Sequence, residues 1–358
     1  MTNVDDAEGS GEEEHDEVLE DEQGVETTVD GPTIEERDDT EKRETAASAS
    51  ASTRSASSDA DSDSEPKSDS QTATVGDEDD RYTRKKSVLI TGCSSGIGRA
   101  TATAFLHDDW QVFATARDTD DIEALAEAGC TTFELDVTDP DQVSRAVERV
   151  VDEADAIDCV VNNAGYAQMG PMEDISTSDL HRQFDVNVYG PHRLVRAALP
   201  HMRAQGAGRI INVSSVFGRV SFAGSGAYSG SKHALEAMSD SLRAEVEEFD
   251  IDVVVIEPGP VETNFADRVG EELPETERSP AYETLYELYE EMRLIGGGSG
   301  GPFASEPDDV AEAILESARA PEPPARYPVG PLAQYGVYAR FLPDTLRDTG
   351  YRLLRKLV

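Results

Sequence analysis

The sequence of 358 residues predicts an α/β fold, a doubly wound parallel sheet in a single domain that begins at Ser87. Two observations predict it. From Ser87 onward, short runs rich in β-branched residues alternate with longer segments of helical pattern, which is typical of parallel βαβ units. The short runs are apolar without polar alternation, as expected for strands whose two faces are both covered by helices. Ligands of such a sheet bind at the carboxyl ends of its strands.

Seven strands are predicted in chain order, and helices fill the segments between them. The predicted strands are Val88–Thr91, Val112–Ala116, Thr131–Leu135, Cys159–Asn162, Arg209–Val213, Val253–Glu257 and Arg326–Val329. The segment 260–301 breaks this rhythm with proline, glutamate, tyrosine and glycine, and we expect it to cover a substrate; a flexible surface excursion is the alternative. A helical extension is predicted at 331–358, and its end is expected to pack on the domain rather than to touch a membrane surface.

Residues 1–86 are predicted to form a disordered acidic tail ahead of a catalytic domain at 87–358. Residues 1–80 contain 28 acidic and 5 basic residues and no aromatic residue, so they cannot bury a core. The simplest interpretation is a solubilising tail, and a partner-binding tail is the alternative.

The remaining residues, 81–358, contain 46 acidic and 26 basic residues, so the acidity is not confined to the tail. Arginine supplies nearly all of their positive charge, because Lys232 is the only lysine between Ser87 and Arg355. Acidic surfaces of this composition resemble those of proteins from salt-rich cytoplasm. No basic stripe is present to neutralise phosphates, which argues against a nucleic-acid partner.

The cysteines and the apolar segments bear on location. Cys93, Cys130 and Cys159 lack the spacing of metal ligands, so we predict no metal site and a reducing compartment. No apolar signal core is present at the N-terminus, and no run of about 18 apolar residues occurs. We therefore expect a cytoplasmic protein without stable membrane insertion.

A tyrosine and a lysine are spaced for acid–base chemistry. Tyr228 and Lys232 are four residues apart in a predicted helix, so their side chains share one face. An ammonium beside a phenol lowers the tyrosine pKa from its usual value of about 10. Such a tyrosine can act as a general acid or base near neutral pH. An exposed helix pair is the alternative for this spacing alone.

A glycine-rich turn joins the first predicted strand to a helix. Its glycines permit a tight turn and let backbone amides and the helix N-terminus approach a pyrophosphate. The residues predicted to do so are Gly92, Ser94, Ser95, Gly96, Ile97 and Gly98.

These segments, together with Asn162-Asn163-Ala164-Gly165 after the fourth strand, resemble the short-chain dehydrogenase/reductase family. The resemblance covers residues 87 to about 265, and more loosely the remainder. It implies a Rossmann-type fold, an NAD(P) cofactor, and hydride transfer between the nicotinamide and a carbonyl or alcohol. Family members are usually homodimers or homotetramers built through the helices that hold Asn187 and Tyr228.

The resemblance also implies roles for four residues. Tyr228 would be the general acid and base, and Lys232 would hold the nicotinamide ribose and stabilise the tyrosinate. Ser215, thirteen residues before Tyr228, matches the serine that steadies the reacting oxygen, with Ser214 as the alternative. Asn187 matches the asparagine that holds a water for proton relay; a satisfied helix amide is its alternative.

Further contacts to the cofactor follow from the same resemblance. Asp136 and Val137 match a pair that contacts adenine, although Asp136 could also cap a helix. The segment from Pro258 matches one that packs on the nicotinamide, with Thr263 bonding its carboxamide. The other implied contacts are Asn163, Ala164, Gly165, Gly259 and Val261.

The end of the second strand bears on the choice of cofactor. NAD-dependent members usually place an acid at the position of Ala116, eighteen residues after Gly98. Here the acid is missing and the next residue is Arg117. Its guanidinium can form a bidentate hydrogen-bonded contact with a 2′-phosphate. NADP(H) is therefore favoured, and NAD(H) remains possible because Asp118 could accept a ribose hydroxyl.

The C-terminal extension bears on the substrate. From Leu332 it resembles the extensions of the retinol, steroid and acyl-dihydroxyacetone-phosphate reducing members, which predicts a lipophilic small molecule. Reduction of a 3-ketoacyl group on a carrier protein or coenzyme A is an alternative, although an acidic carrier would be repelled. The non-enzyme alternative is an NADP-binding scaffold or sensor that acts through the acidic tail.

The acidic composition predicts that the fold needs salt. Repulsion among carboxylates opposes the compact state, and a Debye length of about 3 Å at about 1 M salt screens that repulsion. We expect the melting temperature, followed by circular dichroism, to rise from dilute buffer to molar KCl. An unchanged melting temperature would contradict the salt-adapted interpretation.

Overall fold

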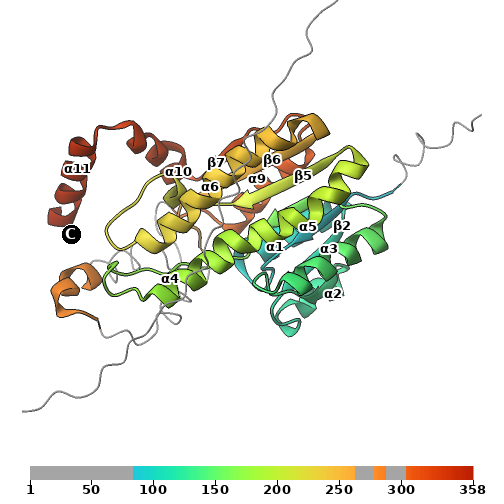
Figure 1. Cartoon of the computed structure of the whole chain (residues 1–358), viewed down its shortest axis with the longest axis horizontal. Helices are drawn as coiled ribbons and strands as arrows, with labels where there is room; N and C mark the ends of the chain where they lie inside the picture. Colours follow the sequence, from blue (N-terminus) through green and yellow to red (C-terminus); the bar gives the residue numbers. More distant parts are fainter. Residues whose placement is uncertain (1–83, 263–277, 288–303, 358) are drawn as a thin grey trace, which may run out of the picture. The chain divides into compact units, whose positions relative to one another are not determined.

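The computed structural model describes residues 84–262, 278–287 and 304–357. Within these residues, one sheet of seven parallel strands has the order β3-β2-β1-β4-β5-β6-β7 (Figure 1). The strands are β1 Ser87–Ile90, β2 Gln111–Ala116, β3 Thr131–Glu134, β4 Cys159–Asn162, β5 Gly208–Val213, β6 Ile251–Pro258 and β7 Arg326–Val329. The seven predicted strands are confirmed, each within two residues at either end.

Helices cover both faces of the sheet (Figure 1). The longer ones are α1 Gly96–His107, α2 Glu123–Ala128, α3 Pro140–Ala154, α4 Thr177–Phe184, α5 Gly190–Gln205, α6 Gly226–Val246, α9 Pro307–Arg319, α10 Pro331–Gly336 and α11 Asp344–Leu357. The short ones are η2 Asp120–Ile122, the π-helix η3 Asp185–Tyr189, η4 Val216–Gly218, η5 Glu247–Phe249, η6 Pro280–Tyr282 and η7 Val337–Phe341.

Two hydrophobic cores fill the spaces between these layers. On one face, Phe105 of α1 and Ile314 of α9 pack on strand residues such as Ile256. On the other face, Val147 of α3 and Leu194 of α5 pack on their own set of strand residues. Successive strand residues point to opposite faces, so an apolar strand supplies both cores.

The strand order reverses between β1 and β4. The chain proceeds outward from β1 through β2 to β3, and then returns to build β4 to β7 on the other side of β1. In a doubly wound sheet this reversal opens a crevice at the carboxyl ends of the strands, where ligands bind. The glycine-rich turn follows β1 and the Asn163 segment follows β4, so both lie at this crevice.

The N-terminus of α3 corrects one alternative from the sequence. Asp139 is the N-cap of α3, because its carboxylate accepts hydrogen bonds from the amides of Asp141 (2.8 Å) and Gln142 (3.0 Å). Asp136 instead accepts from the amide (2.9 Å) and the hydroxyl (2.7 Å) of Thr138. Asp136 therefore shapes the turn after β3 and does not cap the helix.

The boundaries of the domain differ slightly from the expected ones. Arg84 forms a two-pronged ion pair with Asp158, at 2.6 and 2.7 Å, and the Lys86 carbonyl accepts from the Gln111 amide at 2.8 Å. Residues 84–86, assigned to the tail from the sequence, are thus attached to the domain. The predicted tail up to residue 83 lies outside the described residues, as does most of the segment 260–301.

The C-terminal extension is helical, as the sequence predicts. Ala333 of α10 is fully buried against Val216 and Val220. In α11, by contrast, the side chains at 344–350 and 352 are exposed, except that Arg347 is half-buried. The end that was expected to pack begins at Tyr351, and apart from the exposed Arg352 its side chains are not described, so that expectation stays a prediction. No helix among the described residues is long and apolar enough to cross a membrane.

Candidate active site

The turn after β1 forms a cradle that only glycine can build. Gly92 and Gly96 adopt positive φ angles of 73° and 54°, a region that other residues rarely adopt. A Cβ on Gly98 would lie 2.2 Å from the Gly92 carbonyl oxygen, so the start of α1 lies directly against the turn. This close packing leaves the N-terminus of α1 at the crevice.

The segment after β4 locks this turn in place. The Asn163 side chain donates to the carbonyls of Thr91 (2.8 Å) and Gly92 (3.1 Å). The Thr91 hydroxyl accepts in return from the amides of Asn163 (3.1 Å) and Ala164 (3.0 Å). The two motifs are therefore one hydrogen-bonded unit. Thr91 at the centre of this unit was not predicted from the sequence, although a threonine at the end of a strand beside a glycine was the available signal.

The cradle has the features that a pyrophosphate requires. Ser95 is the N-cap of α1, has an extended backbone and makes no side-chain cap hydrogen bond. The first amides of α1 are thus available, and a helix N-terminus carries partial positive charge. Ser94 takes part through its carbonyl, which accepts from Arg99. The residues present therefore fit the phosphate portion of a dinucleotide.

Arg117 lies directly after the carboxyl end of β2. Ala116 is buried, whereas Arg117 and Asp118 are both exposed. The Asp118 carboxylate accepts at 2.9 Å from the amide of Asp120, the first residue of η2. Arg117 makes no hydrogen bond to any described residue. A guanidinium with no partner among the described residues can bind an external anion, whereas the Asp118 carboxylate, the group that could accept a ribose hydroxyl, already accepts from a backbone amide.

Val137 lies in the turn after β3 and is buried. It packs against Gly190 of α5, where an added Cβ would lie 2.8 Å from Val137 Cγ2. Arg193 holds the same turn by donating to the Val137 carbonyl at 3.1 Å. The turn that holds Asp136 and Val137 is thus fixed at the sheet's carboxyl edge.

Tyr228 and Ser215 form the centre of the site. Tyr228 is 8% exposed and its hydroxyl is hydrogen-bonded to Ser215. Ser215 Oγ also lies 3.5 Å from the Pro258 carbonyl oxygen. Ser214 Oγ is buried without a hydrogen-bond partner among the described residues and lies beside Gly218. The geometry thus brings Ser215, and not Ser214, to the tyrosine.

Lys232 lies on the same face of α6 as Tyr228. Its Nζ donates to the Val213 carbonyl at 2.8 Å and lies 5.9 Å from the centroid of the Tyr228 ring. A Cβ on Gly165 would lie 3.7 Å from this Nζ, so the segment after β4 comes close to the lysine. The ammonium is therefore at the junction of β4, β5 and α6.

Asn187 lies in the π-helix η3, a local widening that is common at functional sites. Its amide group donates to the Tyr166 carbonyl (2.9 Å) and to Ser231 Oγ (3.1 Å), and its Oδ1 accepts from the Tyr166 amide (3.1 Å). This residue joins the segment after β4 to α6. Ser231 was not anticipated from the sequence. The expected water-holding role of Asn187 stays a prediction.

Burial dominates the ionisation of the tyrosine and the lysine. It raises the pKa of Tyr228 to about 12, although the hydrogen bond with Ser215 lowers it. It lowers the pKa of Lys232 to about 8, although the nearby Glu236 carboxylate raises it. The expected lowering of the Tyr228 pKa by the ammonium is therefore not seen, because desolvation of the phenolate is the larger effect. At neutral pH the tyrosine is a proton donor.

The segment after β6 closes the site. Gly259 donates to the Val329 carbonyl at 2.9 Å, and Val261 pairs with Ser305. Thr263 lies outside the described residues. Part of the expected covering segment, 278–287, is attached to the segment after β4, because Tyr286 donates to Asp174 at 2.6 Å. The described residues contain no cluster of ligands that could hold a metal ion.

Comparison with known proteins identifies the class. The family model described as short chain dehydrogenase matches residues 86–274. The uncharacterized oxidoreductase YbbO of Escherichia coli (strain K12) is 37% identical over 267 residues, covering 74% of this chain and 93% of that protein. Human retinol dehydrogenase 8 is 34% identical over 254 residues, covering 67% of this chain and 80% of that protein. Human 17-beta-hydroxysteroid dehydrogenase type 1 is 34% identical over 255 residues, covering 67% of this chain and 76% of that protein. The chain belongs to the short-chain dehydrogenase family of oxidoreductase enzymes.

Solved structures agree with the fold. A short-chain dehydrogenase from Streptomyces avermitilis has a TM-score of 0.64 at 33% identity, covering 76% of this chain and 97% of that one. One from Burkholderia phymatum in complex with NAD has a TM-score of 0.57 at 26% identity (65% and 85%). A metagenomic short-chain oxidoreductase in complex with NADP has a TM-score of 0.52 at 25% identity, covering 68% of this chain and 96% of that one. The predicted Rossmann-type fold is confirmed.

Proposed function

We propose that the protein is an NADP(H)-dependent oxidoreductase that interconverts a carbonyl and an alcohol on a lipophilic small molecule, with Tyr228 as general acid and base. One observation carries this proposal: the Tyr228 hydroxyl is bonded to Ser215, and Nζ of the buried Lys232 lies 5.9 Å from the centroid of the Tyr228 ring, at the carboxyl edge of the sheet. The glycine cradle opens on the same edge, so the nucleotide site and the proton donor are adjacent.

The cofactor would be held along the crevice by residues from several strand ends. The cradle after β1 would hold the pyrophosphate, the turn after β3 the adenine, and the segments after β4 and β6 the nicotinamide end. When bound, the nicotinamide supplies the hydride and the protein supplies position and electrostatics. A dinucleotide is supported by the structural neighbours, whose complexes contain NAD or NADP.

Proton transfer would be carried out by Tyr228, with Ser215 and Lys232 assisting it. Tyr228 is protonated at neutral pH, so it can donate its hydroxyl proton to a carbonyl oxygen during reduction. Ser215 would orient that oxygen, because its hydroxyl already bonds the tyrosine. The Lys232 ammonium, fixed by the Val213 carbonyl, would stabilise the tyrosinate left after proton transfer. Asn187 and Ser231 would keep α6 in register with the segment after β4.

The preference for NADP(H) is supported by Arg117. The Arg117 side chain is exposed at the end of β2 and has no hydrogen-bond or ion-pair partner among the described residues, and Ala116 before it offers no carboxylate to a ribose hydroxyl. Asp118, which could favour NAD(H), already accepts from a backbone amide. A free guanidinium beside the adenosine ribose favours the additional 2′-phosphate.

A lipophilic substrate is supported by the C-terminal segment and by two relatives. Side chains of Leu332, Tyr335 and Tyr338 are exposed in α10 and η7, and the same elements pack on the η4 turn that Ser215 begins. The names of the two human relatives are those of a retinol and a steroid dehydrogenase. Both of those substrate types are largely apolar molecules with one reacting oxygen.

Replacing Tyr228 by phenylalanine tests the proposed function. The variant removes the proton donor but keeps the ring, so NADPH binding should persist while turnover falls by about 10² to 10⁴. The measurement is the initial rate of NADPH oxidation with a lipophilic aldehyde or ketone that wild type reduces. Tyr327→Phe removes a hydroxyl that donates to Glu316 of α9 at 2.7 Å, away from the proposed site, and should behave as wild type. Undiminished turnover in Tyr228→Phe would refute the assignment.

Replacing Arg117 by alanine tests the cofactor preference. We expect NADPH binding, titrated by fluorescence in molar KCl, to weaken by about tenfold or more, because one charge-assisted contact is worth about 1.5 to 3 kcal/mol. Binding of NADH should change little. Arg196→Ala, at an exposed arginine of α5, is the matched control. A wild type that prefers NADH tenfold would contradict the Arg117 interpretation.

A further inference from the structure

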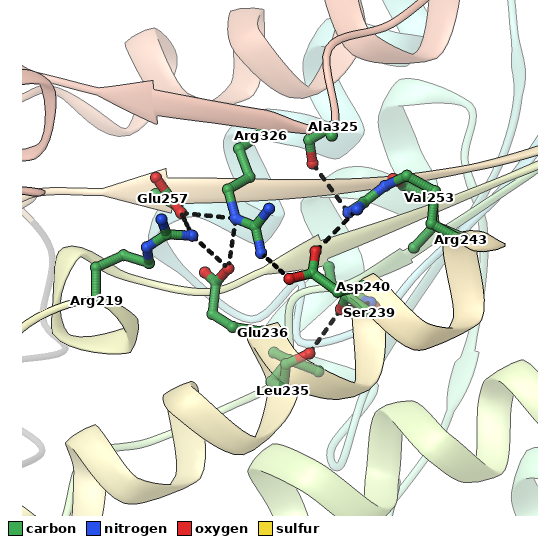
Figure 2. A network of polar contacts seen from close by, with 11 residues as sticks. Arg219, Leu235, Glu236, Ser239, Asp240, Arg243, Val253, Glu257, Ala325 and Arg326 are labelled. Atoms are coloured by element: carbon green, nitrogen blue, oxygen red, sulfur yellow. Dashed lines mark hydrogen bonds and ion pairs between the residues drawn. The ribbon is translucent and has the colours of Figure 1, made fainter.

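Two buried glutamates lie close together between α6 and β6. Glu236 is 5% and Glu257 is 3% exposed. Arg219 Nη1 lies 3.6 Å from Glu236 Oε2 and 3.4 Å from Glu257 Oε1, and Arg326 Nε lies 3.0 and 3.4 Å from the same two oxygens (Figure 2). We call these four side chains the carboxyl cluster. None of the four was predicted from the sequence to have a functional role.

The cluster joins the segments that hold the proposed catalytic groups. Arg219 ends the η4 turn, which Ser215 begins. Glu236 lies one helical turn after Lys232 on α6, and its carboxylate raises the pKa of that lysine. Glu257 directly precedes the carbonyl that accepts the hydrogen bond from Ser215. A change in the cluster therefore acts on all three segments.

The carboxyl groups of the cluster have too few donors for two full negative charges. Oε1 of Glu236 and Oε1 of Glu257 are buried and accept no hydrogen bond from the described residues. Within the cluster, Arg326 donates one hydrogen bond, to Glu236 Oε2, and neither arginine makes a hydrogen bond to Glu257. A buried carboxylate without donors is costly, and a proton removes the charge and supplies a donor.

The charged groups around Glu257 come from three elements. Glu236 faces it from α6, Arg219 from the end of η4, and Arg326 from β7. The pKa of Glu257 is raised to about 7, chiefly by burial and next by the charge of Glu236, whereas the two arginines act in the opposite direction. Arg326 is shared with the more exposed Asp240, at 2.6 Å, so only part of its charge serves the glutamates.

We propose that Glu236 and Glu257 hold one proton between them at neutral pH, and that this hydrogen-bonded pair positions the Ser215, Lys232 and Pro258 segments for the reaction. The pair is a positioning device that acts through other residues and does not itself touch the reacting atoms. This inference rests on the proposed function for its effect on turnover, but the shared proton itself does not.

The pair makes the site sensitive to pH in a stated direction. When the shared proton is lost, two carboxylates repel each other across the contact between α6 and β6. Because the folded-state pKa of Glu257 is raised, its contribution to stability is present at low pH and is lost as the pH rises through about 7. Lys232 acts oppositely and at higher pH: its lowered pKa means that stability rises with pH above about 8.

Infrared spectroscopy can detect the shared proton directly. At a pH of about 6, ordinary carboxyl groups are ionised, so wild type should show the carbonyl stretch of a protonated buried acid, and that band should vanish by pH 9 or so. Labelling wild type with ¹³C-glutamate should shift the band, and this experiment does not depend on the folding of any variant. Glu257→Gln should lack the band, and Glu245→Gln, at an exposed glutamate of the same helix, should keep it. A wild type without the band would overturn the proposal.

The pH profile of turnover tests the positioning role. We expect kcat of wild type to fall as the pH rises through about 7, and Glu257→Gln, whose amide stays neutral and can donate to Glu236, to remove that fall. Glu257→Ala, which cannot donate, should lose more turnover than Glu257→Gln. Coincident profiles for wild type and Glu257→Gln would overturn the positioning role while leaving the reductase assignment intact. If wild type showed the infrared band but no turnover, the result would instead count against the proposed function.

Discussion

The buried ammonium of Lys232 is the interaction on which the rest of the proposed site depends. A charged amine that is only 5% exposed is tolerated only if it is hydrogen-bonded and electrostatically compensated. The Val213 carbonyl supplies the hydrogen bond at 2.8 Å, and the Glu236 carboxylate supplies compensation one turn further along α6. Because Val213 ends β5, this contact fixes how α6 lies against the sheet. Tyr228, one turn earlier on the helix, is placed by the same contact.

The polar side chains around Lys232 fix the positions of backbone segments as well as supplying groups for catalysis. Asn163 and Thr91 tie the turn after β1 to the segment after β4. Asn187, in a π-helix, ties that segment to Ser231 of α6. Such side-chain bonds to backbone rigidify loops that would otherwise be the mobile parts of the fold. A crevice built in this way can keep a proton donor and a nucleotide cradle at a constant separation.

Sequence reasoning reaches the parts of this structure that depend on local pattern. The seven strands and the glycine turn follow from short apolar runs and from glycine spacing, and both are found. The carboxyl cluster could not be found in this way, because its members come from elements far apart in the chain and meet only in the folded sheet. The Tyr228 pKa was expected to be lowered, but burial raises it. Burial depends on how the whole fold packs, so it could not be inferred from the spacing of two residues. The tail, the cytoplasmic location and the oligomeric state stay predictions.

Lys232→Arg tests most directly whether the site depends on a buried ammonium or merely on positive charge. Arginine keeps the charge, but its planar guanidinium is larger and presents its donors in a fixed fork. NADPH binding, turnover and the melting temperature would be measured together in molar KCl. Lys85→Arg, at an exposed lysine, would serve as the control. We expect a folded variant with almost no turnover, and turnover at the wild-type level would contradict the dependence of the site on a buried ammonium.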